Sequence, residues 1–189
     1  GGTRKWYGFN EYLVNWFNDG EEIKSLALQK YNSVTRTVTN IDSYFTPGVT
    51  WSTIGSGTAT FRFFGNGFLF SNSGQSMISN DDFVRYYTGA LLNTKVAKEI
   101  LKVLAPTIGF ESGYLKKIPI LIEKSFNVEL PKTCQEIGEV EWNSKETSWE
   151  FKENEIIRFG NGRIQESFDL YTSYWKSLFN KLHSTEEEL

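Results

Sequence analysis

Residues 58–74 read TATFRFFGNGFLFSNSG and determine which kind of fold this sequence can form. Side chains alternate along an extended strand, so Thr60 and Arg62 share one face while Phe61 and Phe63 share the other. A Gly-Asn-Gly turn follows, and a second extended stretch comes after it. The pattern predicts a β-hairpin whose aromatic face packs inward and whose polar face points outward.

Helical periodicity appears on both sides of this strand region. Residues 21–30, 84–104 and 163–182 carry apolar residues at helical spacing, whereas HSTEEEL at the end of the chain is expected to fray. The sequence therefore predicts an α+β fold. Residues 1–122 are expected to form a β-rich domain with a mixed or antiparallel sheet and packed helices. Residues 123–189 are expected to form a helical or irregular extension that serves as a spacer or packs between domains.

Length and composition suit one ordinary domain, or one domain with an appendage. The chain has 189 residues, of which 39% are hydrophobic and 16% aromatic, so a core can form from few large side chains. No stretch approaches the roughly 18 apolar residues of a membrane helix, and no secretory signal is visible. We therefore expect a cytoplasmic protein without a membrane partner. The leading Gly1-Gly2 pair resembles a cloning remnant, which suggests a piece of a longer protein.

Charge and the reactive side chains narrow the function classes. The net charge is −3, with residues 1–80 at +1 and residues 81–189 at −4, so a DNA-facing first half stays open. Cys134 is the only cysteine and is expected to be a reduced thiol. His183 is the only histidine and lies beside an acidic tail, which argues against a Ser-His-Asp or Cys-His triad. No zinc-protease, Cys-x-x-Cys or phosphate-loop motif is present, so neither catalytic residues nor a metal site are predicted.

The start of the chain mixes aromatic residues with amides and acids. Residues 5–20 read KWYGFNEYLVNWFNDG, and Trp6, Tyr12 and Trp16 are expected to pack against the core. Arg4 and Lys5 precede them and could clamp a nucleic-acid backbone.

Four segments, in order, resemble the large adenine-specific DNA methyltransferases of BREX phage-resistance systems (PglX-like) and related restriction-modification enzymes. They are KWYGFNEYLVNWFNDG (5–20), GVTWSTIGSGTATFRFFGNGFLFSNSGQSMI (48–78), TGALLNTKVAKEILKVLAPTIGFESGYLKKIPI (88–120) and EWNSKETSWEF (141–151). In that family a catalytic domain carries a glycine-rich loop for S-adenosylmethionine and an Asn-Pro-Pro-Tyr motif. Neither motif occurs here, so the resemblance implies a target-recognition part of such an enzyme.

The resemblance also implies partners and a cofactor. The partners would be double-stranded DNA, the catalytic domain of the parent chain and other subunits of the defence system. S-adenosylmethionine would belong to the parent enzyme, with no cofactor in this chain. Phosphate contacts give affinity, and contacts to base edges give sequence choice. The candidate DNA contacts are Arg4, Lys5, Trp51, Ser52, Ser56, Thr58, Thr60 and Arg62.

Two other function classes fit parts of the sequence. A protein-interaction module of the same defence system would use the aromatic-rich face and suits the mild acidity. A carbohydrate-binding β-rich module is suggested by the tryptophans and tyrosines, but the long helices argue against it. Salt dependence separates DNA binding from protein binding, because phosphate-dominated binding weakens steeply with salt.

Overall fold

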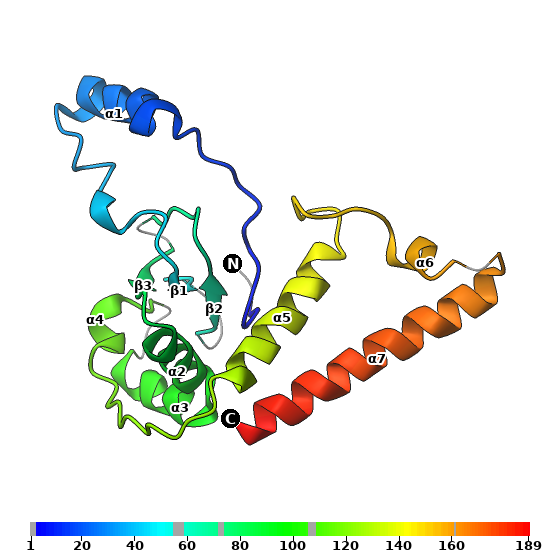
Figure 1. The fold of residues 1–189 in the computed structure, drawn as a ribbon. Coiled ribbons are helices and arrows are strands. Elements are labelled where there is room, and N and C mark those ends of the chain that lie inside the picture. The colour runs from blue at the N-terminus through cyan, green and yellow to red at the C-terminus, as the bar shows by residue number, and fades with distance from the viewer. Residues whose placement is uncertain (1–2, 55–58, 72–73, 106–108, 161) are drawn as a thin grey trace.

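A computed structural model of the chain describes residues 3–54, 59–71, 74–105, 109–160 and 162–189 (Figure 1). Its strands are β1 (Gly48–Trp51), β2 (Phe61–Phe64) and β3 (Ser76–Ile78). Its α-helices are α1 (Phe17–Tyr31), α2 (Asp82–Asn93), α3 (Lys95–Leu104), α4 (Ser112–Leu115), α5 (Glu129–Asn143), α6 (Glu155–Arg158) and α7 (Ile164–Glu188), with a short 3-10 helix η1 (Ile41–Ser43). The predicted α+β class is confirmed.

The sheet is antiparallel and has the strand order β2-β1-β3. The predicted hairpin is wrong in its pairing, because β2 pairs with the earlier strand β1 and not with the stretch after the Gly-Asn-Gly turn. Both edges of β2 are already occupied. The Trp6 N–H donates to the Phe61 carbonyl, and the Phe63 N–H donates to the Trp6 carbonyl, so the start of the chain takes the second edge. The stretch after the turn instead bonds to Phe45 through the Phe68 carbonyl.

Helices α2 and α3 lie where one helix was expected at 84–104. Thr94 separates them with an extended backbone, and its hydroxyl oxygen accepts from the Ala97 N–H, which is an N-cap. The core lies between the sheet and these helices. Phe61, Phe63 and Leu101 are almost fully buried in it.

Helices α5 and α7 extend from the sheet domain. Figure 1 shows them meeting near the C-terminus and diverging toward α6. The sequence did not predict α5, whose buried positions include Cys134, Ile137 and Trp142 at helical spacing. Cys134 belongs to the same core cluster as the sheet residues. The division at residue 122 stays a prediction. The predicted helix at 163–182 is confirmed, but the expected fraying of its end is wrong, since α7 runs to Glu188.

The start of the chain behaves in two ways. Trp6 is buried in the core as predicted, and Trp16 packs edge-on against Tyr44. Tyr12 is 88% exposed, so its expected packing role is wrong. Figure 1 shows α1 standing away from the sheet, connected by the segments on either side of it. Among the described helices, none has the length and apolar character needed to cross a bilayer.

Candidate nucleic-acid interface

One face of the sheet carries polar side chains from all three strands. Thr50 in the central strand lies opposite Arg62 on β2 and opposite Ser76 on β3. Phe61 and Phe63 alternate with Arg62 and join the core on the other face, so the predicted alternation is confirmed. The polar face is therefore on the side of the sheet opposite to helices α2 and α3.

This polar face is covered, so its expected outward orientation is wrong. Thr60 and Arg62 are 6% and 4% exposed. The beginning of the chain crosses beside β2, where the Arg4 carbonyl accepts from the Arg62 guanidinium and the Phe9 ring lies 5.0 Å from it. The covering residues lie about fifty positions earlier in the chain. The alternation pattern within the strand therefore could not predict this burial.

Arg62 has donors without strong partners. Its hydrogen bonds to the Arg4 carbonyl, the Ser52 hydroxyl and the carbonyl and hydroxyl of Thr60 measure 3.2 to 3.5 Å, longer than the usual 2.9 Å or so. Its Nε has no partner, and no ion pair among the described residues includes it. Burial, followed by repulsion from Arg4, lowers the pKa of Arg62 to about 10, so the group stays charged at neutral pH.

Arg4 and Lys5 are held by other parts of the chain. Arg4 donates to the Gly138 carbonyl at 2.9 Å and forms an ion pair with Glu141, both on α5. Burial acts to raise the pKa of Glu141, but hydrogen bonds from Lys145 and Arg4 outweigh it and hold the pKa below its usual value. Lys5 contacts Glu186 on α7 at 3.0 Å. Both cations therefore fasten the start of the chain to the last helices.

The remaining candidates lie in different places. Trp51 is 3% exposed, faces the core and donates its indole N–H to the Phe110 carbonyl at 2.8 Å, so its expected groove-facing position is wrong. Ser52 is half-buried beside Arg62. Ser56 and Thr58 lie outside the described residues. The structure thus brings Ser52, Thr60 and Arg62 together. The eight residues stay predictions as DNA contacts.

A row of lysines on α3 was not among the predicted contacts. Lys95, Lys98 and Lys102 follow i, i+3, i+7 spacing, which places them on one face of the helix. Desolvation lowers the pKa of Lys98, the charges of Lys5 and Lys95 lower it further, and the charge of Glu186 acts in the opposite direction. Lys102 pairs with Glu99 at 2.6 Å. The helical spacing in the sequence is the signal that could have identified this lysine row.

Asn93 is the second residue whose role the sequence did not predict. Its side-chain oxygen accepts from the Phe61 N–H at 3.1 Å, and its amide donates to the Phe61 carbonyl at 3.0 Å. The last residue of α2 therefore bonds directly to the backbone of β2. Asn93 lies in the ALLNTKV stretch, and a buried amide at a helix end next to apolar residues was the available signal.

Other chemistry-bearing groups give no site. Cys134 is fully buried, and burial raises the pKa of its thiol to about 12, so little thiolate forms at neutral pH. His183 is exposed on α7 near Glu187. Within the described ranges, no three histidine, cysteine, aspartate or glutamate side chains gather closely enough to hold a metal ion.

No protein-family model matches the sequence. Two curated proteins are similar to it along its whole length. It is 31% identical over 191 residues to the adenine-specific methyltransferase BrxX of Escherichia coli O9:H4 (strain HS), and 32% identical over 195 residues to the adenine-specific methyltransferase PglX of Lacticaseibacillus casei (strain Zhang). The chain spans only 15% and 16% of the length of these relatives. It is therefore homologous to one region of BrxX/PglX-type adenine-specific methyltransferases.

Proposed function

We propose that this chain is a DNA target-recognition region of an adenine-specific methyltransferase in a BREX-type phage-defence system. The observation that carries the proposal is the similarity of the whole chain to part of two proteins named adenine-specific methyltransferases. None of the four prolines is adjacent to another, so the sequence lacks the Asn-Pro-Pro-Tyr motif. The role we assign to this region is finding the site at which the enzyme turns the target adenine out of the stack.

The charges suggest how DNA would be held. The lysine row of α3, Lys95, Lys98 and Lys102, would contact phosphates, and this contact supplies affinity that does not depend on sequence. The catalytic domain of the parent enzyme would bind S-adenosylmethionine. The enzyme would act in the cytoplasm.

The test is duplex binding by the whole chain, measured by fluorescence anisotropy over a series of salt concentrations. Replacing Lys95, Lys98 and Lys102 by Ala should weaken binding and lower the slope of log affinity against log salt by about 0.9 for each DNA phosphate that is no longer neutralised. The matched control replaces three exposed lysines elsewhere, Lys152, Lys176 and Lys181. If the chain binds no duplex at low salt, or if both triple variants lose affinity equally, the proposal fails.

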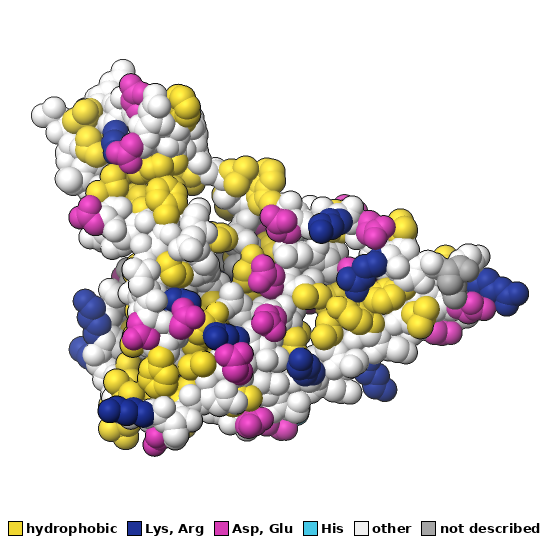
Figure 2. Space-filling view, in the orientation of Figure 1, with side chains coloured by type: hydrophobic (Ala, Val, Ile, Leu, Met, Phe, Trp, Pro, Cys, Tyr) yellow, Lys and Arg dark blue, Asp and Glu magenta, His cyan; other side chains and the backbone are white. Residues whose placement is uncertain are grey.

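A protein-interaction module is the second candidate function, and a specific surface favours it. Tyr12 and Leu13, in the segment leading into α1, are 88% and 72% exposed, and Phe17, its first residue, is 77% exposed. Figure 2 shows hydrophobic side chains on the surface around α1 as well. Contiguous exposed apolar residues of this kind commonly mark protein-binding surfaces. Capture of a defence-system subunit that persists at high salt and is lost on Leu13→Ser would support this alternative.

A further inference from the structure

Arg62 differs from the other buried arginine of the described chain. Arg85 is 8% exposed, forms an ion pair with Asp82 and donates to the Ser79 carbonyl at 2.9 Å. Arg62 is 4% exposed and has only neutral partners at 3.2 Å or more. A buried charge is normally neutralised by a close opposite charge, because burial removes the water that stabilises it. Arg62 therefore lacks the anion that its surroundings call for.

The groups around Arg62 suit a phosphate oxygen. Its Nε is a buried donor without a partner, and the guanidinium presents several donors in one plane, which matches the oxygens of a phosphate group. The Ser52 hydroxyl lies 3.2 Å from the guanidinium and can donate to the same anion. The positive charge of Arg4 lies near enough to lower the pKa of Arg62, so the local field also favours an anion.

Phe9 covers this group and is weakly held. Its ring lies over the guanidinium, touches Trp142 edge-on at 6.0 Å and is itself 39% exposed. Phe9 and Trp6 both have positive φ angles, 64° and 69°, in the left-handed region that aromatic residues rarely adopt. Such strained backbone is typical of segments with a functional constraint.

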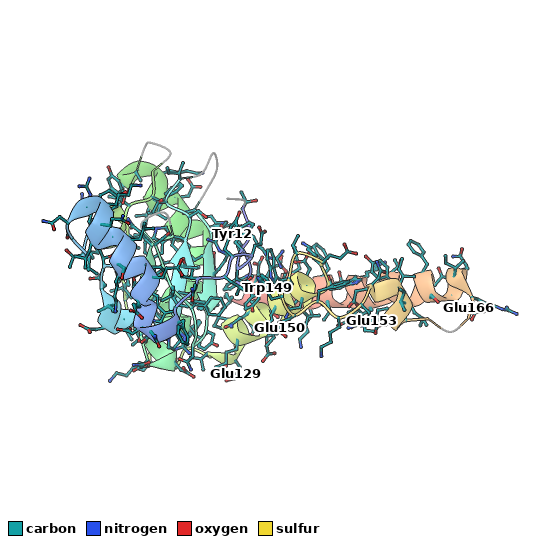
Figure 3. All side chains as sticks on the ribbon, turned by 90° about the horizontal axis from the view of Figure 1, so that it is seen from above. Tyr12, Glu129, Trp149, Glu150, Glu153 and Glu166 are labelled. Atoms are coloured by element: carbon teal, nitrogen blue, oxygen red, sulfur yellow. The ribbon has the colours of Figure 1, made fainter. Side chains whose placement is uncertain are left out.

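The strained segment is attached on both sides of Phe9. Before it, Arg4 donates to the Tyr7 carbonyl at 2.5 Å. After it, the Trp149 indole donates to the Glu11 carbonyl at 2.9 Å, and Figure 3 shows Tyr12 next to Trp149. Residues between these two attachments form neither helix nor strand. Phe9 can therefore move away from Arg62 without disrupting an element of the fold.

We propose that Arg62 and Ser52 form a covered phosphate-binding site, which opens when Phe9 moves aside to admit a backbone phosphate of DNA. The inference rests on the proposed function, which supplies the source of the phosphate. A covered site binds more weakly, because only the fraction of molecules in the open state can take up the phosphate. Phe9 thereby sets how tightly the phosphate is held.

The test measures two ligands on the whole chain: inorganic phosphate by calorimetric titration at ionic strength fixed with chloride, and duplex DNA by anisotropy. Phe9→Ala should bind inorganic phosphate about tenfold more tightly than the unchanged chain, the gain expected if the closed state holds roughly nine molecules in ten. Phe17→Ala removes another exposed phenylalanine, at the start of the helix α1 that stands away from the sheet (Figure 1), and should leave the affinity unchanged.

Two further variants tie the gain to the site. In the Phe9→Ala background, Ser52→Ala and Arg62→Lys should each weaken phosphate binding, and near-UV circular dichroism checks that both variants fold. If Phe9→Ala and Phe17→Ala bind phosphate alike, or if Arg62→Lys and Ser52→Ala both keep the gain, the site is disproved. If the chain binds duplex DNA but the phosphate titration gives neither expected result, this inference is overturned and the proposed function stands. An Arg62-dependent phosphate gain without any duplex binding overturns DNA as the source.

Discussion

At the scale of single residues, the polar groups of the sheet are held mainly by partners distant in sequence. Asn93, at the end of α2, satisfies the backbone N–H and carbonyl of Phe61 at the same time. The Phe61 carbonyl also accepts from the Trp6 N–H, whereas the Phe61 N–H depends on Asn93 alone among the described contacts. Asn93 therefore links a helix, an edge strand and the start of the chain.

Asn93→Ala should lower the free energy of unfolding by about 1–3 kcal/mol, because it leaves a buried backbone N–H without a partner. Urea unfolding followed by tryptophan fluorescence measures this as a lower midpoint with an unchanged slope. Asn180→Ala on the exposed side of α7 is the control and should change stability by less than about 0.5 kcal/mol. Equal midpoints for the two variants would contradict the assigned role.

The polar sheet face shows where prediction from sequence ends at this scale. Alternation placed Thr60 and Arg62 together correctly, because side-chain direction along a strand is a local property. Their burial depends on Phe9 and the Arg4 carbonyl, which arrive from the beginning of the chain. The same limit explains Trp51, whose indole partner Phe110 lies 59 positions away.

At the scale of elements, the long amphipathic segments were predictable and the pairings were not. The regular part of α1 begins after left-handed residues at 18–20, which agrees with the predicted helix at 21–30. Strand β2 was identified, but its partners β1 and Trp6 were not, because alternation within a strand does not specify which segment pairs with its edges. Helix α5 was missed because Pro131, Cys134 and Gly138 on its buried face are weak hydrophobic signals.

The packing of α2 on the sheet depends on Gly89. A Cβ atom there would lie 2.4 Å from a ring atom of Phe63, whose side chain is 2% exposed and has little room to move. Gly89→Ala gains about 1 kcal/mol of helix propensity but overpacks the core, so we expect a net loss of roughly 1–2 kcal/mol in unfolding free energy.

Thermal and urea unfolding of a double-mutant cycle measure this steric contact. Phe63→Leu removes the ring atoms, so Gly89→Ala should be far less harmful in that background than in the unchanged chain. Gly113→Ala on α4, where the new Cβ meets nothing within 4 Å, is the control. A Gly89→Ala chain as stable as the unchanged one would show that the helix moves away from the sheet at little cost.

At the scale of the whole molecule, the first and last residues of the chain are joined. Glu186 on α7 accepts from the Trp6 indole at 2.5 Å and from Lys5 at 3.0 Å. Leu182 and Leu189 pack against the core cluster that contains Trp6 and Cys134. The junction residues Lys5, Trp6, Leu182 and Glu186 also line a cavity of about 710 Å³ between α5 and α7. The last turn of α7 thus closes the core.

Deleting residues 184–189 tests this closure, and the thiol of Cys134 supplies the readout. Cys134 is fully buried with a pKa raised to about 12, so a thiol reagent at pH 8 reacts only when the core opens. The deletion removes Glu186 and Leu189, and we expect labelling to accelerate about tenfold for each 1.4 kcal/mol of stability lost, with a matching fall in the urea midpoint.

The control is Glu187→Gln with Glu188→Gln, two exposed residues of the same turn, which changes the charge but keeps the packing. If the deleted chain labels no faster than this control and unfolds at the same urea concentration, the end of α7 is not part of the closure.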